Sequence, residues 1–240
     1  ETDSEIALVF VGSSSTAFVR HSNEPSTSGE GIDLSDISLT GAQEQLIRSV
    51  CATGKPVVVV LVAGKPFAIP YIKEKVPAIL AQWYAGEQAG NSIADILFGK
   101  VNPSGKLPFS FPQSTGHLPA YYNYLPTDKG YYKEPGTYTS PGRDYVFSSP
   151  APLWTFGHGL SYTRFEYVQA TTDKTSYQPH DTIRISVKVK NSGKLAGKEV
   201  VQIYIHDVVS TVMTPVKQLK GFKKIELQPG EEKLVQLKVP

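Results

Sequence analysis

The stretch KPVVVVLVAG, residues 55–64, is a nearly continuous run of β-branched residues that ends at a glycine. A similar run, EIALVFVG, occupies residues 5–12, and PAILAQWY follows at residues 77–84. Runs of this kind, without polar alternation, are typical of strands that are covered on both faces in a parallel sheet. The three stretches therefore predict neighbouring strands of one parallel sheet.

Helical patterns separate these strands. Thr40 followed by Gln43 has the spacing of a capping box, which predicts a helix start. Apolar residues then recur on one helical face, at Leu46, Ile47 and Val50. Residues 86–99 repeat the pattern, with Ala89, Ile93, Ile96 and Leu97. Strand, helix and strand in this order indicate right-handed crossovers and an α/β layer with flanking helices.

The chain changes character after residue 112. Residues 113–161 are rich in Pro, Gly and Tyr and show no sustained period. The tyrosines at 121, 122, 124, 131, 132, 138 and 145 make this segment too apolar for a free linker. We expect an extended connector that lies across a surface. Its aromatic rings either line a ligand subsite or pack against the α/β layer, and we expect the packing.

A two-residue period dominates the last third of the chain. It places Ile183, Ile185, Val187 and Val189 on one face, and the segments EVVQIYI (199–205) and KLVQLKV (233–239) alternate in the same way. Turn signals separate these segments. Clean alternation predicts antiparallel sheets packed on one side, so we expect an all-β sandwich here.

Composition excludes several classes of protein. The 240 residues carry a formal net charge of +2, which gives no reason to expect nucleic acid as a partner. The longest apolar run, residues 57–63, is far shorter than the roughly 20 residues needed to cross a bilayer. The five histidines and Cys51 show no metal-ligand spacing, and Cys51 is expected on the buried face of its helix. The first ten residues lack Met and the plan of an export signal, so the sequence is either a mature product or a piece of a longer chain, and we expect a piece.

Glu30 stands between two glycines in SGEG, residues 28–31. Glycine permits positive φ and close approach of the backbone to a ligand, so this carboxylate is either an ordinary turn residue or a presented chemical group. Spacing alone favours the turn residue. Other candidate motifs fail, because VFVGSSST lacks a phosphate-loop pattern and GLSYT (159–163) lacks the second glycine of a nucleophile elbow. The lysines at 217, 220, 223 and 224 favour a solvated strand edge.

Several long blocks resemble glycoside hydrolase family 3. They are SGEG with the following DLSDISL (33–39), TGKPVVVVLVAGKPF (53–67), WYAGEQAGNSIADILFGKVNPSGKLPFSFP (83–112), WTFGHGLSYTRFEY (154–167) and VKNSGKLAGKEVVQIYI (189–205). Ala85 stands where the family usually has proline. The resemblance covers essentially the whole chain.

The resemblance implies a retaining, exo-acting enzyme that releases β-linked glucose or xylose from the non-reducing end of oligosaccharides or aryl β-glycosides. In this family an aspartate nucleophile comes from an N-terminal (β/α)8 barrel, and a glutamate in a loop of the α/β domain is the general acid/base. Glu30 matches that glutamate. Asp33 and Asp36 are either sugar contacts or residues that order the loop. No cofactor or metal is implied, and no substrate-binding residue is assigned.

The same resemblance implies the domain plan. We expect an α/β sandwich domain over residues 1–112 that lacks its first strand, the connector over 113–161, and a truncated fibronectin type III-like domain over 162–240. Nothing in the sequence resembles the barrel, so these residues alone are expected to be inactive. Export to a periplasm or the cell exterior is a family-level expectation. A non-catalytic scaffold or carbohydrate-contacting module remains the alternative.

Overall fold

The structure is a computed structural model that describes residues 4–15, 26–31, 33–126, 137–140 and 148–240. The chain divides into two compact units. The first, here called the α/β unit, contains Glu1–Ile93, Phe109–Ala120 and Tyr132–Thr155. The second, called the β unit, contains Ala94–Pro108, Tyr121–Tyr131 and Phe156–Pro240. The helices of the described residues are too short to cross a membrane.

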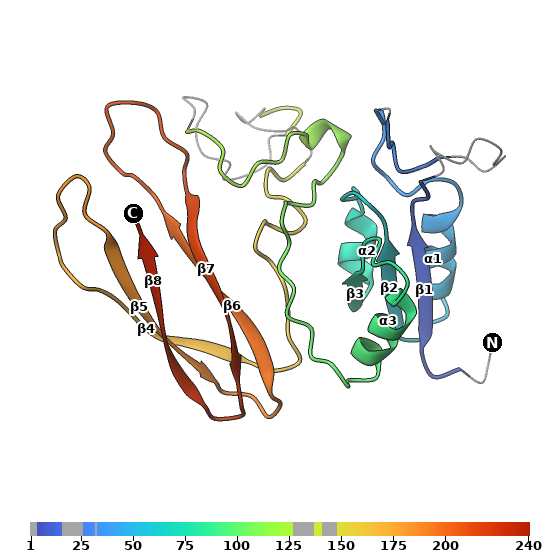
Figure 1. Cartoon of the computed structure of the whole chain (residues 1–240). Helices are drawn as coiled ribbons and strands as arrows, with labels where there is room; N and C mark the ends of the chain where they lie inside the picture. Colours follow the sequence, from blue (N-terminus) through green and yellow to red (C-terminus); the bar gives the residue numbers. More distant parts are fainter. Residues whose placement is uncertain (1–3, 16–25, 32, 127–136, 141–147) are drawn as a thin grey trace. The chain divides into compact units, whose positions relative to one another are not determined.

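The α/β unit is built on a parallel sheet in the order β1-β2-β3 (Figure 1). Its strands are β1 (Ala7–Gly12), β2 (Val57–Val62) and β3 (Ala78–Ala81), as the apolar runs predict. Val59 pairs with Val9 on one side and with Ile79 on the other. The central strand is buried on both faces, with Val59 and Val60 fully inaccessible.

The prediction that all these strands are covered on both faces is wrong for β1, and β3 is only partly buried. Val9 and Val11 are buried, whereas Leu8 is 44% and Phe10 is 53% exposed. Successive side chains of a strand point to opposite faces, so one face of β1 is buried and the other is open. The reason is packing on the faces: the described residues cover the side of β1 that carries Val9 and Val11 and leave the side that carries Leu8 and Phe10 exposed.

In the described residues, three α-helices accompany this sheet: α1 (Gln43–Cys51), α2 (Pro70–Lys75) and α3 (Ala89–Leu97) (Figure 1). The predicted capping box is wrong, because the N-cap is Ala42 and no side chain caps the helix. Ile47 is fully buried, but Leu46 is 51% exposed and does not share the core-facing side of α1. Cys51 is only partly buried. Sequence patterns did not indicate α2, which starts with a proline in its first turn.

The β unit contains two antiparallel sheets. One has the order β4-β5-β8, formed by β4 (Phe165–Thr172), β5 (Ile183–Asn191) and β8 (Glu232–Val239). The other pairs β6 (Gly197–Ile205) with β7 (Gln218–Leu227). Residues of both sheets form one apolar core: Val187, Val189, Val201, Ile225, Leu227, Val235 and Leu237. The alternating segments thus form the predicted sandwich.

The connector contributes to both units. Phe111 and Trp154 of the α/β unit bridge through their backbones, and their rings meet edge to face at 5.4 Å. Tyr122 belongs instead to the β unit, where it stacks on Phe156 at 4.1 Å. The expectation that the tyrosines pack on the α/β layer is therefore wrong for Tyr122. The tyrosines at 131, 132 and 145 lie outside the described residues, and the boundaries at 112 and 161 stay predictions.

Candidate functional site

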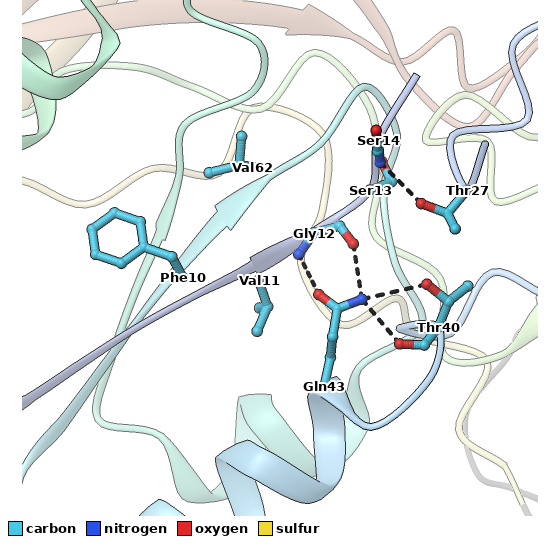
Figure 2. A pocket seen from close by; sticks show the side chains of 9 residues that line it. All are labelled: Phe10, Val11, Gly12, Ser13, Ser14, Thr27, Thr40, Gln43 and Val62. Atoms are coloured by element: carbon cyan, nitrogen blue, oxygen red, sulfur yellow. Dashed lines mark hydrogen bonds between the residues drawn. The ribbon is translucent and has the colours of Figure 1, made fainter. Parts of the chain in front are cut away.

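A pocket opens where β1 and β2 end (Figure 2). Its volume is about 450 Å³, and its lining comes from both strand ends and from the approach to α1: Phe10, Val11, Gly12, Ser13, Ser14, Thr27, Thr40, Gln43 and Val62. Ligand sites of open parallel sheets characteristically lie outside the carboxyl ends of the strands. The lining is neutral, with hydroxyl and amide groups beside the half-exposed Phe10 ring.

Gly12 ends β1 in a position that only glycine fits. A Cβ atom on Gly12 would lie 1.7 Å from the carbonyl oxygen of Val62, which is far inside van der Waals contact. The Gln43 side chain holds the same backbone: Gly12 N donates to Oε1 at 2.7 Å, and Nε2 donates to Gly12 O at 3.0 Å (Figure 2). The start of α1 is thereby attached directly to the strand end.

Ser14 ties together the two described ends of the segment that follows β1. Its carbonyl oxygen accepts from the backbone N–H groups of Thr27, at 2.9 Å, and Ser28, at 3.0 Å. Its own N–H donates to Thr27 Oγ1 at 2.9 Å. Lys65, just after β2, donates from Nζ to the carbonyl oxygen of Thr27 at 3.1 Å. The sheet thus holds the chain three residues before Glu30.

Lys65 and Asp36 are electrostatically coupled beside this tie. Burial lowers the pKa of Lys65, and the Asp36 carboxylate partly offsets that effect. Hydrogen bonds from the backbone and side chain of Ser38, at 2.8 and 2.9 Å, hold the pKa of Asp36 below its usual value. These contacts favour the loop-ordering interpretation of Asp36. Sequence reasoning missed Lys65; its place directly after the buried strand was the available signal.

Glu30 is exposed and lies between two glycines in the left-handed region, with φ of 79° at Gly29 and 76° at Gly31. Residues with a Cβ adopt such angles only with strain, so the glycines shape the turn that carries the carboxylate. Glu30 N donates to Ser28 Oγ at 3.2 Å, and Ser15 Oγ donates to the carboxylate oxygen Oε2. Sequence reasoning did not single out Ser15, which is fifteen positions away.

Other sequence candidates do not join this site. Asp33 is exposed, and no contact brings it to Glu30 in the part of the chain that the structure describes. Within those same residues, no three His, Cys, Asp or Glu side chains gather to form a metal site. The lysines at 217, 220, 223 and 224 are exposed along or beside β7, as expected for a solvated strand.

Family models match parts of both units. The family model "Glycosyl hydrolase family 3 C-terminal domain" matches residues 1–162, and the model "Fibronectin type III-like domain" matches residues 199–240. The chain belongs to glycoside hydrolase family 3. The predicted resemblance is therefore confirmed, as is the fold class of an α/β layer followed by a fibronectin III-like sandwich.

Individual relatives are enzymes by their names. The chain is 44% identical to a β-xylosidase of Formosa agariphila, over 89% of this chain and 28% of that protein. It is 45% identical to a periplasmic β-glucosidase of Salmonella typhimurium, over 86% of this chain and 27% of that protein. A β-glucosidase from Listeria innocua solved with isofagomine has a TM-score of 0.86 and 35% identity, covering 99% of this chain and 32% of its own. The chain thus spans less than a third of these relatives.

Proposed function

We propose that this chain is the C-terminal part of a retaining, exo-acting β-glycosidase, and that Glu30 is its general acid/base. The substrates would be oligosaccharides or aryl glycosides with β-linked glucose or xylose at the non-reducing end. The relatives support this class, because their names identify them as β-glucosidases and a β-xylosidase. By the same analogy, the complete enzyme would act in a periplasm or outside the cell.

The observation that carries the proposal is the presentation of Glu30. Its carboxylate is exposed on a turn shaped by two left-handed glycines, and the chain before that turn is tied to the sheet through Ser14 and Lys65. An ordinary turn residue needs neither an anchored backbone before the turn nor a hydroxyl group bound to its carboxylate. A group that must reach a substrate held by another domain needs both exposure and a defined position.

The chemistry divides between two carboxyl groups. Protonated Glu30 gives its proton to the glycosidic oxygen as the bond between that oxygen and the anomeric carbon breaks, while the second carboxylate attacks the anomeric carbon. Ionised Glu30 then takes a proton from water as the water oxygen attacks that carbon and releases the second carboxylate. The two groups must be about 5–5.5 Å apart. The family resemblance implies that the second is an aspartate of an N-terminal barrel.

Substitution of Glu30 tests the assignment in the complete polypeptide that carries these 240 residues. Glu30→Gln should slow hydrolysis of a substrate with a poor leaving group by about 10²–10⁴-fold, the usual range for a lost acid/base. Breaking the bond to a dinitrophenolate leaving group needs little protonation, so kcat/KM for such a substrate, which excludes the later attack of water, should change far less. Glu166→Gln, the same change at an exposed position of β4, is the control. Equal rates of Glu30→Gln and wild type on the substrate with the poor leaving group would refute the acid/base role.

The 240 residues alone should not hydrolyse an aryl β-glucoside, because only one member of the carboxyl pair is expected among them. The measurement is release of the aryl group by the pure chain and by its Glu30→Gln variant. Turnover by the pure chain that disappears in the variant would contradict this part of the proposal.

A second candidate, a non-catalytic module that contacts carbohydrate, is favoured by one observation. The pocket at the strand ends is neutral and combines hydroxyl groups with the Phe10 ring, which suits a polyhydroxylated ligand. Glucose or xylose titrated into the 240-residue chain should then shift amide resonances of Gly12 and Thr40. Such shifts together with a fully active Glu30→Gln enzyme would favour the module over the acid/base assignment.

A further inference from the structure

We propose that Ser15 is a positioning residue for Glu30, and that its hydroxyl fixes which carboxylate oxygen exchanges the proton. The inference rests on the acid/base role proposed above. It names a residue that neither the sequence patterns nor the family blocks single out.

The backbone brings Ser15 to this place through its neighbour. Ser14 accepts two backbone hydrogen bonds from Thr27 and Ser28 and donates a third to Thr27. These contacts align the end of β1 with the start of the Glu30 turn, so the next residue, Ser15, faces the carboxylate. Because Ser14 is itself only two residues past Gly12, the position of Ser15 derives from the sheet.

The two groups that hold Glu30 act on different parts of it. Ser28 Oγ accepts from the Glu30 backbone N–H at 3.2 Å and thereby sets where the side chain begins. Ser15 Oγ donates to Oε2 and thereby sets the rotation of the carboxylate. Together they reduce the orientations open to an exposed, flexible side chain.

A serine hydroxyl suits both protonation states of a general acid/base. It donates to Oε2 when the carboxylate is ionised, and a hydroxyl can rotate and continue to contact that oxygen when the group is protonated. With Oε2 engaged by Ser15, the proton given to the glycosidic oxygen, and later taken from water, is carried on Oε1. Without the hydroxyl, the Glu30 carboxylate would rotate freely, and either of its oxygens could carry the exchanged proton.

A purely structural role of the bond between Ser15 and Glu30 predicts a different result from a positioning role. If Ser15 only closes the loop, its removal should lower stability and reduce turnover of every substrate alike. If Ser15 orients the acid, its removal should affect mainly the step that needs protonation, with kcat changed and KM nearly constant.

The experiment uses the complete polypeptide with Ser15→Ala, Ser15→Thr and Glu30→Gln, each assayed on alkyl and dinitrophenyl β-glucosides. Ser15→Ala should lower kcat for the alkyl substrate by roughly tenfold, as expected for a lost hydrogen bond to a charged group. Its kcat/KM on the dinitrophenyl substrate, which reports only the steps up to release of the leaving group, and its unfolding temperature should match wild type. Ser15→Thr, which keeps the hydroxyl, should recover most of the loss. Ser176→Ala, at an exposed site of the β unit, controls for loss of a serine hydroxyl.

The outcomes separate the two proposals. A selective loss in Ser15→Ala that Ser15→Thr rescues supports the positioning role. Equal loss on both substrates with a lowered unfolding temperature, or no loss while Glu30→Gln is impaired, overturns that role and leaves the acid/base assignment intact. Unchanged rates in Glu30→Gln overturn both.

Discussion

The side-chain amide of Gln43 forms two hydrogen bonds with a single residue, Gly12: its Oε1 accepts from the backbone N–H and its Nε2 donates to the backbone carbonyl. A side-chain amide carries a donor and an acceptor side by side, and it keeps both at every pH. Through these two bonds, the first residue of α1 satisfies both backbone groups of the last residue of β1, as a residue of a neighbouring strand would. This join forms one wall of the pocket (Figure 2).

Gln43→Glu should destabilise the α/β unit. The carboxylate can still accept from Gly12 N, but it loses the donor to Gly12 O and to Thr40 O and faces those carbonyl oxygens with a negative charge. We expect the free energy of unfolding to fall by about 1–3 kcal/mol, the cost of unsatisfied partly buried groups. Urea denaturation of the 240-residue chain measures it. Gln45→Glu, an exposed change on the same helix, is the control; an equal effect at both positions would show that the Gly12 contacts contribute nothing.

A nearly buried ion pair lies within the β unit. Lys106 Nζ contacts Glu199 Oε2 at 3.1 Å, with side-chain exposures of 17% and 10%. Tyr167 donates to Glu199 Oε1 at 3.0 Å, and burial, together with the adjacent carboxylate, raises the pKa of Tyr167 above its ordinary value. Removing Lys106 leaves the nearly buried Glu199 carboxylate without its cation, although the Tyr167 hydroxyl still donates to it. Breaking a buried ion pair typically costs about 3–5 kcal/mol.

Lys106→Met should therefore reduce the free energy of unfolding by an amount near the lower end of that range, since some solvent reaches the pair. The matched surface pair is Lys198 and Glu226, 3.7 Å apart and more than half exposed, where Lys198→Met should cost less than about 1 kcal/mol. Thermal and urea unfolding of both variants give the comparison. Equal costs at the two pairs would contradict the argument from burial.

His117 should make the α/β unit less stable in acid. Burial lowers the pKa of His117, and a hydrogen bond to the Pro150 backbone partly offsets that effect; Nδ1 accepts from Gln113 N at 3.1 Å, a bond that needs this nitrogen unprotonated. The unfolded state thus binds a proton more readily than the folded state. The contribution of His117 is fully present above the unfolded pKa of about 6.5 and declines as the pH falls below it.

The free energy of unfolding, measured by urea between pH 7.5 and 5, should accordingly decrease with acidification. His117→Asn keeps an acceptor for Gln113 N without a titrating group, so its curve should be flatter over this interval. His206→Asn, at an exposed position, should keep the slope of the wild-type protein. A His117→Asn curve as steep as wild type would assign the acid sensitivity to other groups.

Local sequence patterns correctly predicted the strands whose formation depends on residues close together in the sequence. A run of β-branched residues has few stable alternatives to a buried strand, so residues 57–62 were predicted well, as were the alternating segments of β5, β6 and β8. Helix α2 was missed because six residues are too few to show a period. Leu46 was misplaced because periodicity gives the apolar residues of a helix but not the width of the face that is covered.

Sequence alone determined the α/β layer, the sandwich, the family and the choice of Glu30 as the candidate acid/base, since each depends on residue types and spacings along the chain. Only the tertiary structure decided that β1 is open on one face, that Gln43 binds Gly12, that Lys65 donates to Thr27, and that Ser15 donates to Glu30. These are contacts between residues 15 to 38 positions apart. Such contacts are set by how strands and helices pack, which no local pattern encodes.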